Sequence, residues 1–342
     1  MAVTVETKQY DFLDKSIINQ KSIIYRLDVN GKRFYYEWVD DKPVIYSSGT
    51  TIISDGFPDP SKGLEEWRVK MRVMGKDPDD YARYRANYGT IMHILFGHLL
   101  MRKPIDLVHL DKYILELKDT GISDDDRKTL VENNLNEFKK DLLSFAQWVK
   151  DYKVKPIAIE LMLASREYKV ATAVDYICQL TIKEKGFFGE TYKSGAKKGQ
   201  QKESAREREV VAIIDFKSGK KGFYDKHALQ LLLNKIIVEE NYGEKLKVEK
   251  LFNFSPKEWK STPSYNFKDQ TNNRILEELD DILSIGMKRH ARKQPMVVDY
   301  KGVLNFKNPE NFNYKDNIVY VPLDEYIINN YSDLKETNGK KH

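Results

Sequence analysis

The chain has 342 residues, of which 41% are hydrophobic and 32% are charged, a composition typical of a soluble globular protein. Its single cysteine, Cys178, excludes an intrachain disulfide, a four-cysteine zinc site and a cysteine-ligated iron–sulfur cluster. No apolar run approaches the roughly 20 residues that span a bilayer, and the N-terminus lacks the apolar core of a secretory signal. We therefore expect a cytoplasmic protein without a membrane partner, and its net charge of +5 is compatible with a polyanionic partner.

The first part of the chain combines a short β-rich segment with three helices. Residues 21–38 predict a β-hairpin, because Asn30 and Gly31 at its centre tolerate the positive φ angles of a two-residue turn. A short strand is expected at 43–46, and two prolines shortly after residue 57 end this segment. Apolar residues then recur at helical spacing, which predicts helices at 62–75, 79–103 and 124–150.

The rest of the chain alternates strands and helices around a basic segment. Residues 183–208 hold eight Lys or Arg residues and few aliphatic ones, so we expect an exposed loop or hairpin tip there. Strands are expected at 156–164, 168–182, before Asp215, at 248–254 and near 317–322, and helices at 225–242 and near 272–290. We expect the polar tail at 336–342 to be disordered.

This order of elements predicts an α/β fold with a mixed central β-sheet flanked by helices and an N-terminal β-hairpin segment. The chain divides into a β-rich segment at 1–60, a core at 61–255 that contains the basic insertion 183–208, and an accessory α/β segment at 256–342. Active groups in such sheets tend to collect at the ends of strands.

The most informative stretch is the strand from Val211 to Ile214, which ends in Asp215 and is followed by Lys217. Side chains two residues apart on a strand share a face, so the carboxylate and the ammonium point the same way. This pair suits metal-dependent phosphate chemistry: the acid holds a divalent cation, and the lysine positions a water or offsets charge on a phosphate. A surface ion pair at a strand end is the competing interpretation.

Four further polar residues interrupt apolar elements. His93 lies inside a helix one turn after Gly89, a glycine that would let a neighbouring backbone approach closely. Glu160 and Asp175 lie on strands, and Gln230 lies on the helix that follows Asp215. Each has a purely structural alternative: a core histidine, surface acids and an exposed glutamine. Buried acids are costly unless they are paired or bound to metal, so three acids on neighbouring strands favour a shared cation.

These residues, in chain order, resemble a known family. The pattern resembles the PD-(D/E)XK nuclease superfamily through five features. They are the Gly-Thr-x-x-His motif that ends at His93, Glu160, Asp175, the Asp-Phe-Lys-Ser-Gly motif that begins at Asp215, and Gln230 with its following leucine. The branch that it resembles more closely joins RecB-type nuclease domains, CRISPR-adaptation nucleases and phage recombination exonucleases. The resemblance covers roughly residues 44–255. It implies a restriction-endonuclease-like core and a metal-dependent DNA nuclease, an exonuclease in phage-type recombination, repair or processing.

The resemblance also implies a role for each residue. Asp175 and Asp215 would be the carboxylate ligands of Mg²⁺, for which Mn²⁺ would substitute. His93 would be a further ligand, and Glu160 would support the metal or its waters. Lys217 would position the nucleophilic water and offset charge on the scissile phosphate. Gln230 would orient this lysine or contact the DNA backbone.

Three features depart from the family pattern. Ala173 stands where a glycine often precedes the first aspartate, and Asn234 replaces the tyrosine that often follows the glutamine motif. The link between the two metal-binding acids is long, because the basic segment interrupts it, which puts the geometry toward the substrate in doubt. The single cysteine also separates the chain from relatives that carry an iron–sulfur cluster.

The basic segment is expected to contact the DNA backbone through six residues: Lys193, Lys197, Lys198, Lys202, Arg206 and Arg208. A solvated loop that touches nothing is the alternative. DNA is the expected partner, with a single-strand annealing or binding protein and a homo-oligomer as further candidates, in the host cytoplasm if a phage encodes the chain. A non-catalytic DNA-binding member of the fold, an endonuclease and a small-molecule phosphoesterase remain alternative functions.

Overall fold

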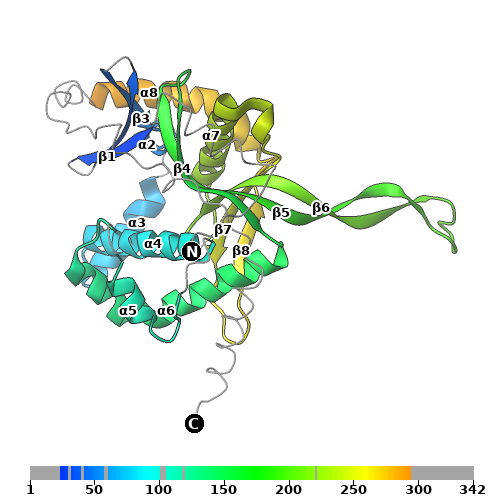
Figure 1. Cartoon of the computed structure of the whole chain (residues 1–342), viewed down its shortest axis with the longest axis horizontal. Helices are drawn as coiled ribbons and strands as arrows, with labels where there is room; N and C mark the ends of the chain where they lie inside the picture. The colour runs from blue at the N-terminus through cyan, green and yellow to red at the C-terminus, as the bar shows by residue number, and fades with distance from the viewer. Residues whose placement is uncertain are drawn as a thin grey trace, which may run out of the picture.

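The computed structural model describes residues 24–29, 32–39, 42–57, 61–100, 105–117, 120–219 and 222–293. Its strands form one eight-stranded sheet in the order β1-β2-β3-β5-β6-β7-β8, with β4 also paired to β5 (Figure 1). The strands are β1 (Tyr25–Val29), β2 (Lys32–Val39), β3 (Lys42–Ser48), β4 (Lys155–Ser165), β5 (Val170–Thr191), β6 (Gln201–Phe216), β7 (Lys250–Pro256) and β8 (Tyr265–Asp269). The β3–β5 and β6–β7 pairs are parallel and the other pairs are antiparallel. The expected α/β fold with a mixed sheet and flanking helices is confirmed.

Helices cover both faces of the sheet (Figure 1). One layer contains α4 (Pro78–Leu100), α5 (Leu110–Leu115) and α6 (Asp124–Asp151), and the other contains α2 (Gly49–Gly56), α7 (Asp225–Tyr242) and α8 (Leu279–Lys293). The remaining helical segments are α3 (Ser61–Val73) and the 3₁₀ turns η1 (Gly243–Leu246) and η2 (Arg274–Glu278). No helix in these described segments is long and apolar enough to cross a membrane.

Strand alternation builds the two halves of the core. Tyr176 and Phe216 face α4 and α6, where they join an aromatic cluster with Phe145 and Trp148. Ile177, the residue after Tyr176, packs on the opposite face with the leucines of α7. Both faces of the central strands are therefore buried, and their relative position is fixed by packing from two sides.

The second layer includes a close crossing of α2 and α8 that the sequence did not predict. A Cβ atom built on Gly56 would lie 1.9 Å from the carbonyl oxygen of Ile282, and one built on Gly286 would lie 2.2 Å from that of Ile52. Only glycine allows the two backbones to approach so closely. This crossing fixes α8 to the rest of the molecule.

The sheet runs across the expected segment boundaries near residues 60 and 255. Strand β3 pairs with β5 through Ser47 and Ser48, so the N-terminal strands join the central sheet. Strand β8 pairs with β7, so residues after Pro256 continue the same sheet. The expected turn at Asn30 and Gly31, the strand at 317–322 and the tail at 336–342 lie outside the described residues.

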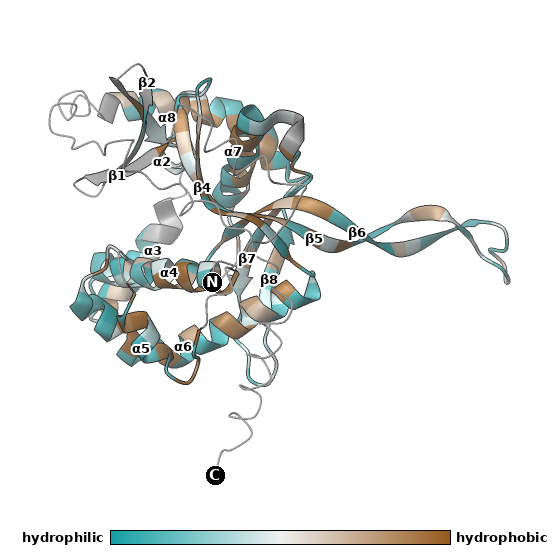
Figure 2. Cartoon of the chain, viewed as in Figure 1, coloured by the Kyte–Doolittle hydropathy of each residue, from teal (hydrophilic) through white to brown (hydrophobic). Residues whose placement is uncertain are grey.

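Strands β5 and β6 continue far beyond the core as a two-stranded ribbon (Figure 1). The sequence predicted a strand only to residue 182, followed by a loop or hairpin tip; the structure has a hairpin whose strands extend to Thr191 and resume at Gln201. Most of the outer ribbon is hydrophilic (Figure 2). The strand pattern was missed because a ribbon that is exposed on both faces has no apolar alternation to reveal it.

Candidate active site

Three acids lie level with one another on three adjacent strands. Glu160 on β4 lies opposite Asp175 on β5, because the residues on either side of each are paired partners. The antiparallel register of β5 and β6, which begins with Tyr176 opposite Ile214, brings Asp215 level with Asp175 just beyond that pair. Like charges in neighbouring cross-strand positions destabilise a sheet, so this row requires positive charge nearby.

Strand pairing is interrupted beside Asp175, the middle acid of the three. On one edge of β5, strand β3 pairs with Val170 and Ala171, and β6 joins only from Tyr176 onward. Asp175 lies in the gap between these two partners, and its Oδ2 atom accepts the backbone N–H of Phe216 at 2.9 Å. The side chain of Asp175 thus bonds to the backbone of β6 just beyond the last paired residue of that strand.

The backbone of Glu160 is strained. This residue has a φ of 50° within β4, in the left-handed region that residues other than glycine rarely adopt. Such a conformation costs about 1–3 kcal/mol, and it interrupts the regular alternation of side chains along the strand. The half-exposed Glu160 carboxylate consequently reaches the imidazole of His93.

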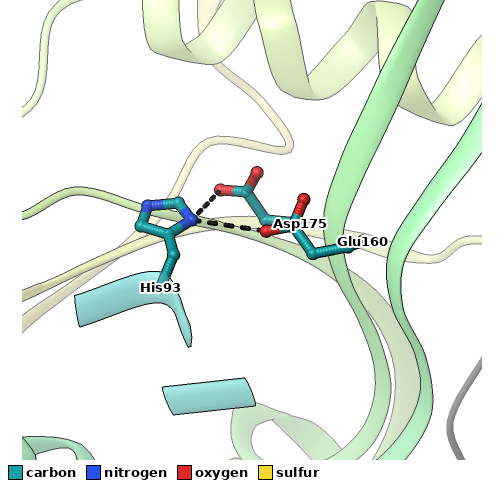
Figure 3. A group of neighbouring side chains, drawn as sticks. All are labelled: His93, Glu160 and Asp175. Carbon is teal, nitrogen blue, oxygen red and sulfur yellow. Dashed lines mark ion pairs between the residues drawn. The ribbon is translucent and has the colours of Figure 1, made fainter. Parts of the chain in front are cut away.

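His93 approaches both acids from α4 (Figure 3). Its Nδ1 atom lies 3.5 Å from Glu160 Oε1 and 4.0 Å from Asp175 Oδ2, and its ring packs in a T-shaped arrangement with that of Phe216. One ligand atom from each of the three residues lies within 4.8 Å of the others. An imidazole nitrogen with two carboxylates is a donor set suited to a divalent cation such as Mn²⁺ or Mg²⁺.

Asp215 lies outside that compact group and is held by other contacts. Its side chain is only 1% exposed. The ammonium of Lys217 donates to Asp215 Oδ1 at 2.7 Å, and the side-chain amide of Asn253 donates to Asp215 Oδ2 at 2.6 Å. Lys217 also lies 3.4 Å from Gln230 Oε1 on α7. The sequence-based hypothesis gave Asp215 the direct ligand role and Glu160 a supporting one, whereas the geometry places Glu160 beside His93 and Asp175.

The charges of the site stabilise one another. Burial opposes the charge of Lys217, but Asp215 and Asp175 outweigh this effect and raise the pKa of the lysine. Burial also favours a neutral imidazole at His93, yet Asp175 and Glu160 raise the pKa of His93 to about 9. At neutral pH the metal-free site therefore contains two cations among its acids.

Burial acts in the other direction on the acids. It raises the pKa of Asp175, with Glu160 adding to the effect and His93 and Lys217 opposing it. Burial likewise raises the pKa of Asp215 against the opposing charge of Lys217. Carboxylates that lie close together in a poorly solvated environment are typical of sites that bind a cation.

Two residues near the site were missed by the sequence analysis. His227 on α7 accepts the backbone N–H of Tyr224 through Nδ1 at 3.2 Å, and burial followed by the charge of Lys217 lowers the pKa of His227 to about 4. Asn253 was missed although it carried a signal, a polar residue between two phenylalanines in the apolar strand β7. Its register partner is Asp215.

Gly89 has the close neighbour that its position in the helix suggested. A Cβ atom on Gly89 would lie 3.0 Å from the hydroxyl oxygen of Ser218, the residue after Lys217. The neighbour is a side chain and not the backbone that the sequence analysis expected. A glycine here lets α4 approach the segment that carries the lysine.

The six basic residues of the ribbon fall into two groups. Lys193, Lys197, Lys198 and Lys202 are exposed around the turn that joins β5 to β6. Arg206 and Arg208 lie closer to the core, and Arg208 is engaged by Glu249 at 2.5 Å and by Glu184 at 3.3 Å. Four of the six are therefore exposed near the tip of the ribbon, whereas Arg208 is paired with acids nearer the core.

The structure thus brings together His93, Glu160, Asp175, Asp215 and Lys217 at one level of the central sheet, with Gln230 beside the lysine. The six basic ribbon residues lie apart from this group. The chain matches no protein-family model, and a search of curated proteins finds none with significant similarity to it.

Proposed function

We propose that the chain is a metal-dependent DNA nuclease that hydrolyses phosphodiester bonds, acting as an exonuclease in phage-type DNA recombination, repair or processing. The observation that carries the proposal is the row of Glu160, Asp175 and Asp215 on adjacent strands, with Lys217 bonded to the last of them. Acids that converge on a cation, next to a charged lysine, suit the hydrolysis of a phosphodiester.

His93, Glu160 and Asp175 would hold the cation, Mg²⁺ or Mn²⁺, because their ligand atoms lie within 4.8 Å of one another and the acids otherwise repel. When bound, the cation supplies positive charge to the phosphate and lowers the pKa of a water molecule. The protein contributes rigidity: Asp175 is fixed by the N–H of Phe216, and α4 and β4 supply its two neighbours.

Lys217 would act on the scissile phosphate. Asp215 and Asp175 keep its ammonium charged, and the contact of 2.7 Å with Asp215 fixes its direction. A fixed cation offsets the negative charge that develops in the transition state without needing to reorganise. Gln230, whose Oε1 lies 3.4 Å from the lysine nitrogen, would limit its movement.

The tip of the ribbon would bind DNA at a distance from the catalytic residues. Its exposed lysines form a positive tip that suits phosphate contacts without reading the sequence. DNA would be the partner, with a single-strand annealing or binding protein as a second one, in the cytoplasm.

The test is a digest of linear DNA labelled at its 5′ or 3′ end, beside closed circular DNA, with Mg²⁺ or Mn²⁺ added. We expect the linear DNA to be shortened from an end and the circular DNA to survive, and the Asp175→Asn variant to be inactive. Cleavage of the circle would make the chain an endonuclease instead. If the chain binds DNA but degrades none of it with either metal, the catalytic proposal is overturned in favour of a binding protein.

A further inference from the structure

A chain of three side-chain amides leads away from Asp215, through strand β7 and the segment after β8, to the start of η2. Asn253 donates to Asp215 Oδ2 at 2.6 Å, Gln270 donates to Asn253 Oδ1 at 2.9 Å, and Asn273 donates to Gln270 Oε1 at 3.0 Å. The chain ends at the backbone N–H of Ile275, which donates to Asn273 Oδ1 at 3.2 Å. We call Asn253, Gln270 and Asn273 the amide relay.

Both ends of the amide relay fix its direction. A carboxylate can only accept hydrogen bonds, so the NH₂ group of Asn253 must face Asp215. A backbone N–H can only donate, so the oxygen of Asn273 must face Ile275. Every amide between them then points its NH₂ group toward the carboxylate. Reversing any one amide would leave two like atoms in contact.

The relay occupies positions where apolar side chains would be expected. Asn253 and Gln270 are buried, and they lie on strand β7 and just after strand β8. Burying an amide is unfavourable unless its hydrogen bonds are made, and two apolar residues of similar shape would serve packing at least as well. Hydrogen bonds in a row within a low-dielectric interior also strengthen one another.

We propose that the amide relay positions the carboxylate of Asp215, and through it the ammonium of Lys217, for the reaction. This inference rests on the proposed nuclease function and adds three residues to it. Asn253 holds one carboxylate oxygen while Lys217 takes the other, so the plane of the carboxylate is fixed. None of the three relay residues is expected to touch the substrate; they are positioning residues.

The first test replaces Asn253 by leucine, which keeps its shape but donates no hydrogen bond. Loss of a partner that orients an active-site group typically lowers activity about 10- to 100-fold. We expect a fall of that size in kcat on labelled DNA, with KM and DNA affinity in Ca²⁺ within about twofold of the wild type. Gln270→Met, one step further from the site, should show a smaller fall in kcat and covers the case in which Asn253→Leu does not fold.

The matched control is Asn266→Leu. Asn266 lies on the same strand pair and donates to Ser255 at 3.2 Å, but it is not connected to Asp215. This variant should keep the kcat of the wild type. Equal losses in Asn266→Leu and Asn253→Leu would mean that the strand pair matters only for stability and would overturn the proposal.

A crystal structure of Asn253→Leu gives a readout that does not depend on activity. We expect the Asp215 carboxylate to rotate and its 2.7 Å contact with Lys217 to be lost or lengthened. If the contact does not move and kcat is unchanged, the proposal that the amide relay positions Asp215 is overturned. If the wild type proves inactive on DNA but the carboxylate still rotates in the variant, the relay stands and the proposed function fails.

Discussion

Strands β5 and β6 have a buried half and an exposed half, and the two halves differ in what holds them together. Near the core, residues 170–178 and 210–216 are mostly buried between helices on both faces. In the ribbon at 183–208 the same backbone pairing continues, but no helix covers it in the described structure. The comparison teaches that pairing extends a strand, whereas burial decides where its side chains are held rigidly enough for chemistry.

The ribbon replaces burial by contacts between its own side chains. The Phe188 ring lies over Gly186, where a Cβ atom would be 3.2 Å from it, and the Arg206 guanidinium lies 4.5 Å from the centre of the same ring. Arg208 pairs with Glu184 across the strands. Arg206 and Arg208 are thus engaged within the protein, whereas the lysines of the tip are exposed.

The largest expected difference between the halves concerns catalysis. Asp175→Asn in the buried half should lower kcat by about 10³-fold or more, because the cation site loses a charged ligand. Binding of DNA in Ca²⁺ should change little. Cleavage of end-labelled DNA under single-turnover conditions measures the loss, and Asp125→Asn, an exposed acid on α6, is the control. Activity within about tenfold of the wild type would remove Asp175 from the site.

Lys217→Met should lower kcat by about 10²- to 10³-fold, the loss typical of removing one group that stabilises charge in the transition state. One charge among many phosphate contacts contributes little to affinity, so the dissociation constant in Ca²⁺ should stay within about threefold. A loss confined to affinity would mean that the lysine only clamps a phosphate, like a residue of the ribbon.

Two truncations on the same strand compare the halves in stability. Ile177→Ala removes a fully buried side chain from β5 and should lower the free energy of unfolding by about 2–5 kcal/mol. Phe187→Ala removes a larger side chain that is 65% exposed and should change it by no more than about 0.5 kcal/mol. Urea denaturation measures both, and similar losses would show that the ribbon is packed against something.

Neutralising the ribbon tip should act on binding alone. Replacing Lys193, Lys197, Lys198 and Lys202 by glutamine should weaken DNA binding equally for all sequences. It should also flatten the log–log salt dependence by about 0.9 for each phosphate contact that is lost. Replacing Arg208, which is already paired with two acids, should have a smaller effect on this slope. An unaltered slope in the quadruple variant would show that the tip is a solvated loop that does not contact DNA.

The last comparison concerns the metal-free protein and its pH dependence. Asp175 and Glu160 raise the pKa of His93 to about 9 in the folded state, above about 6.5 in the unfolded state. Its stabilising contribution is therefore complete below about pH 6.5 and is lost as the pH rises through about 9. The stability advantage of the wild type over His93→Gln, measured by urea denaturation in EDTA, should shrink across that range. A stability advantage that stays constant from pH 6 to 10 would show that the acids do not raise the pKa of His93.

The sequence by itself determined the elements whose side chains are buried on a regular period. The helix at 124–150 and the strand before Asp215 were predicted because their apolar residues recur at helical or strand spacing. The helix at 225–242 was predicted with the same bounds as α7. The sequence also singled out His93, Glu160, Asp175 and Asp215, because each polar residue interrupts an apolar element.

Only the tertiary structure decided how those residues meet. Register across strands joins residues far apart in the chain, so the level positions of Glu160, Asp175 and Asp215 and the contact of Asn253 with Asp215 could not be read from spacing. The left-handed backbone at Glu160 and the glycine crossing of α2 and α8 also depend on neighbours from distant segments. Local periodicity reports what a side chain faces, whereas register and close approach are set by the packing of the whole sheet.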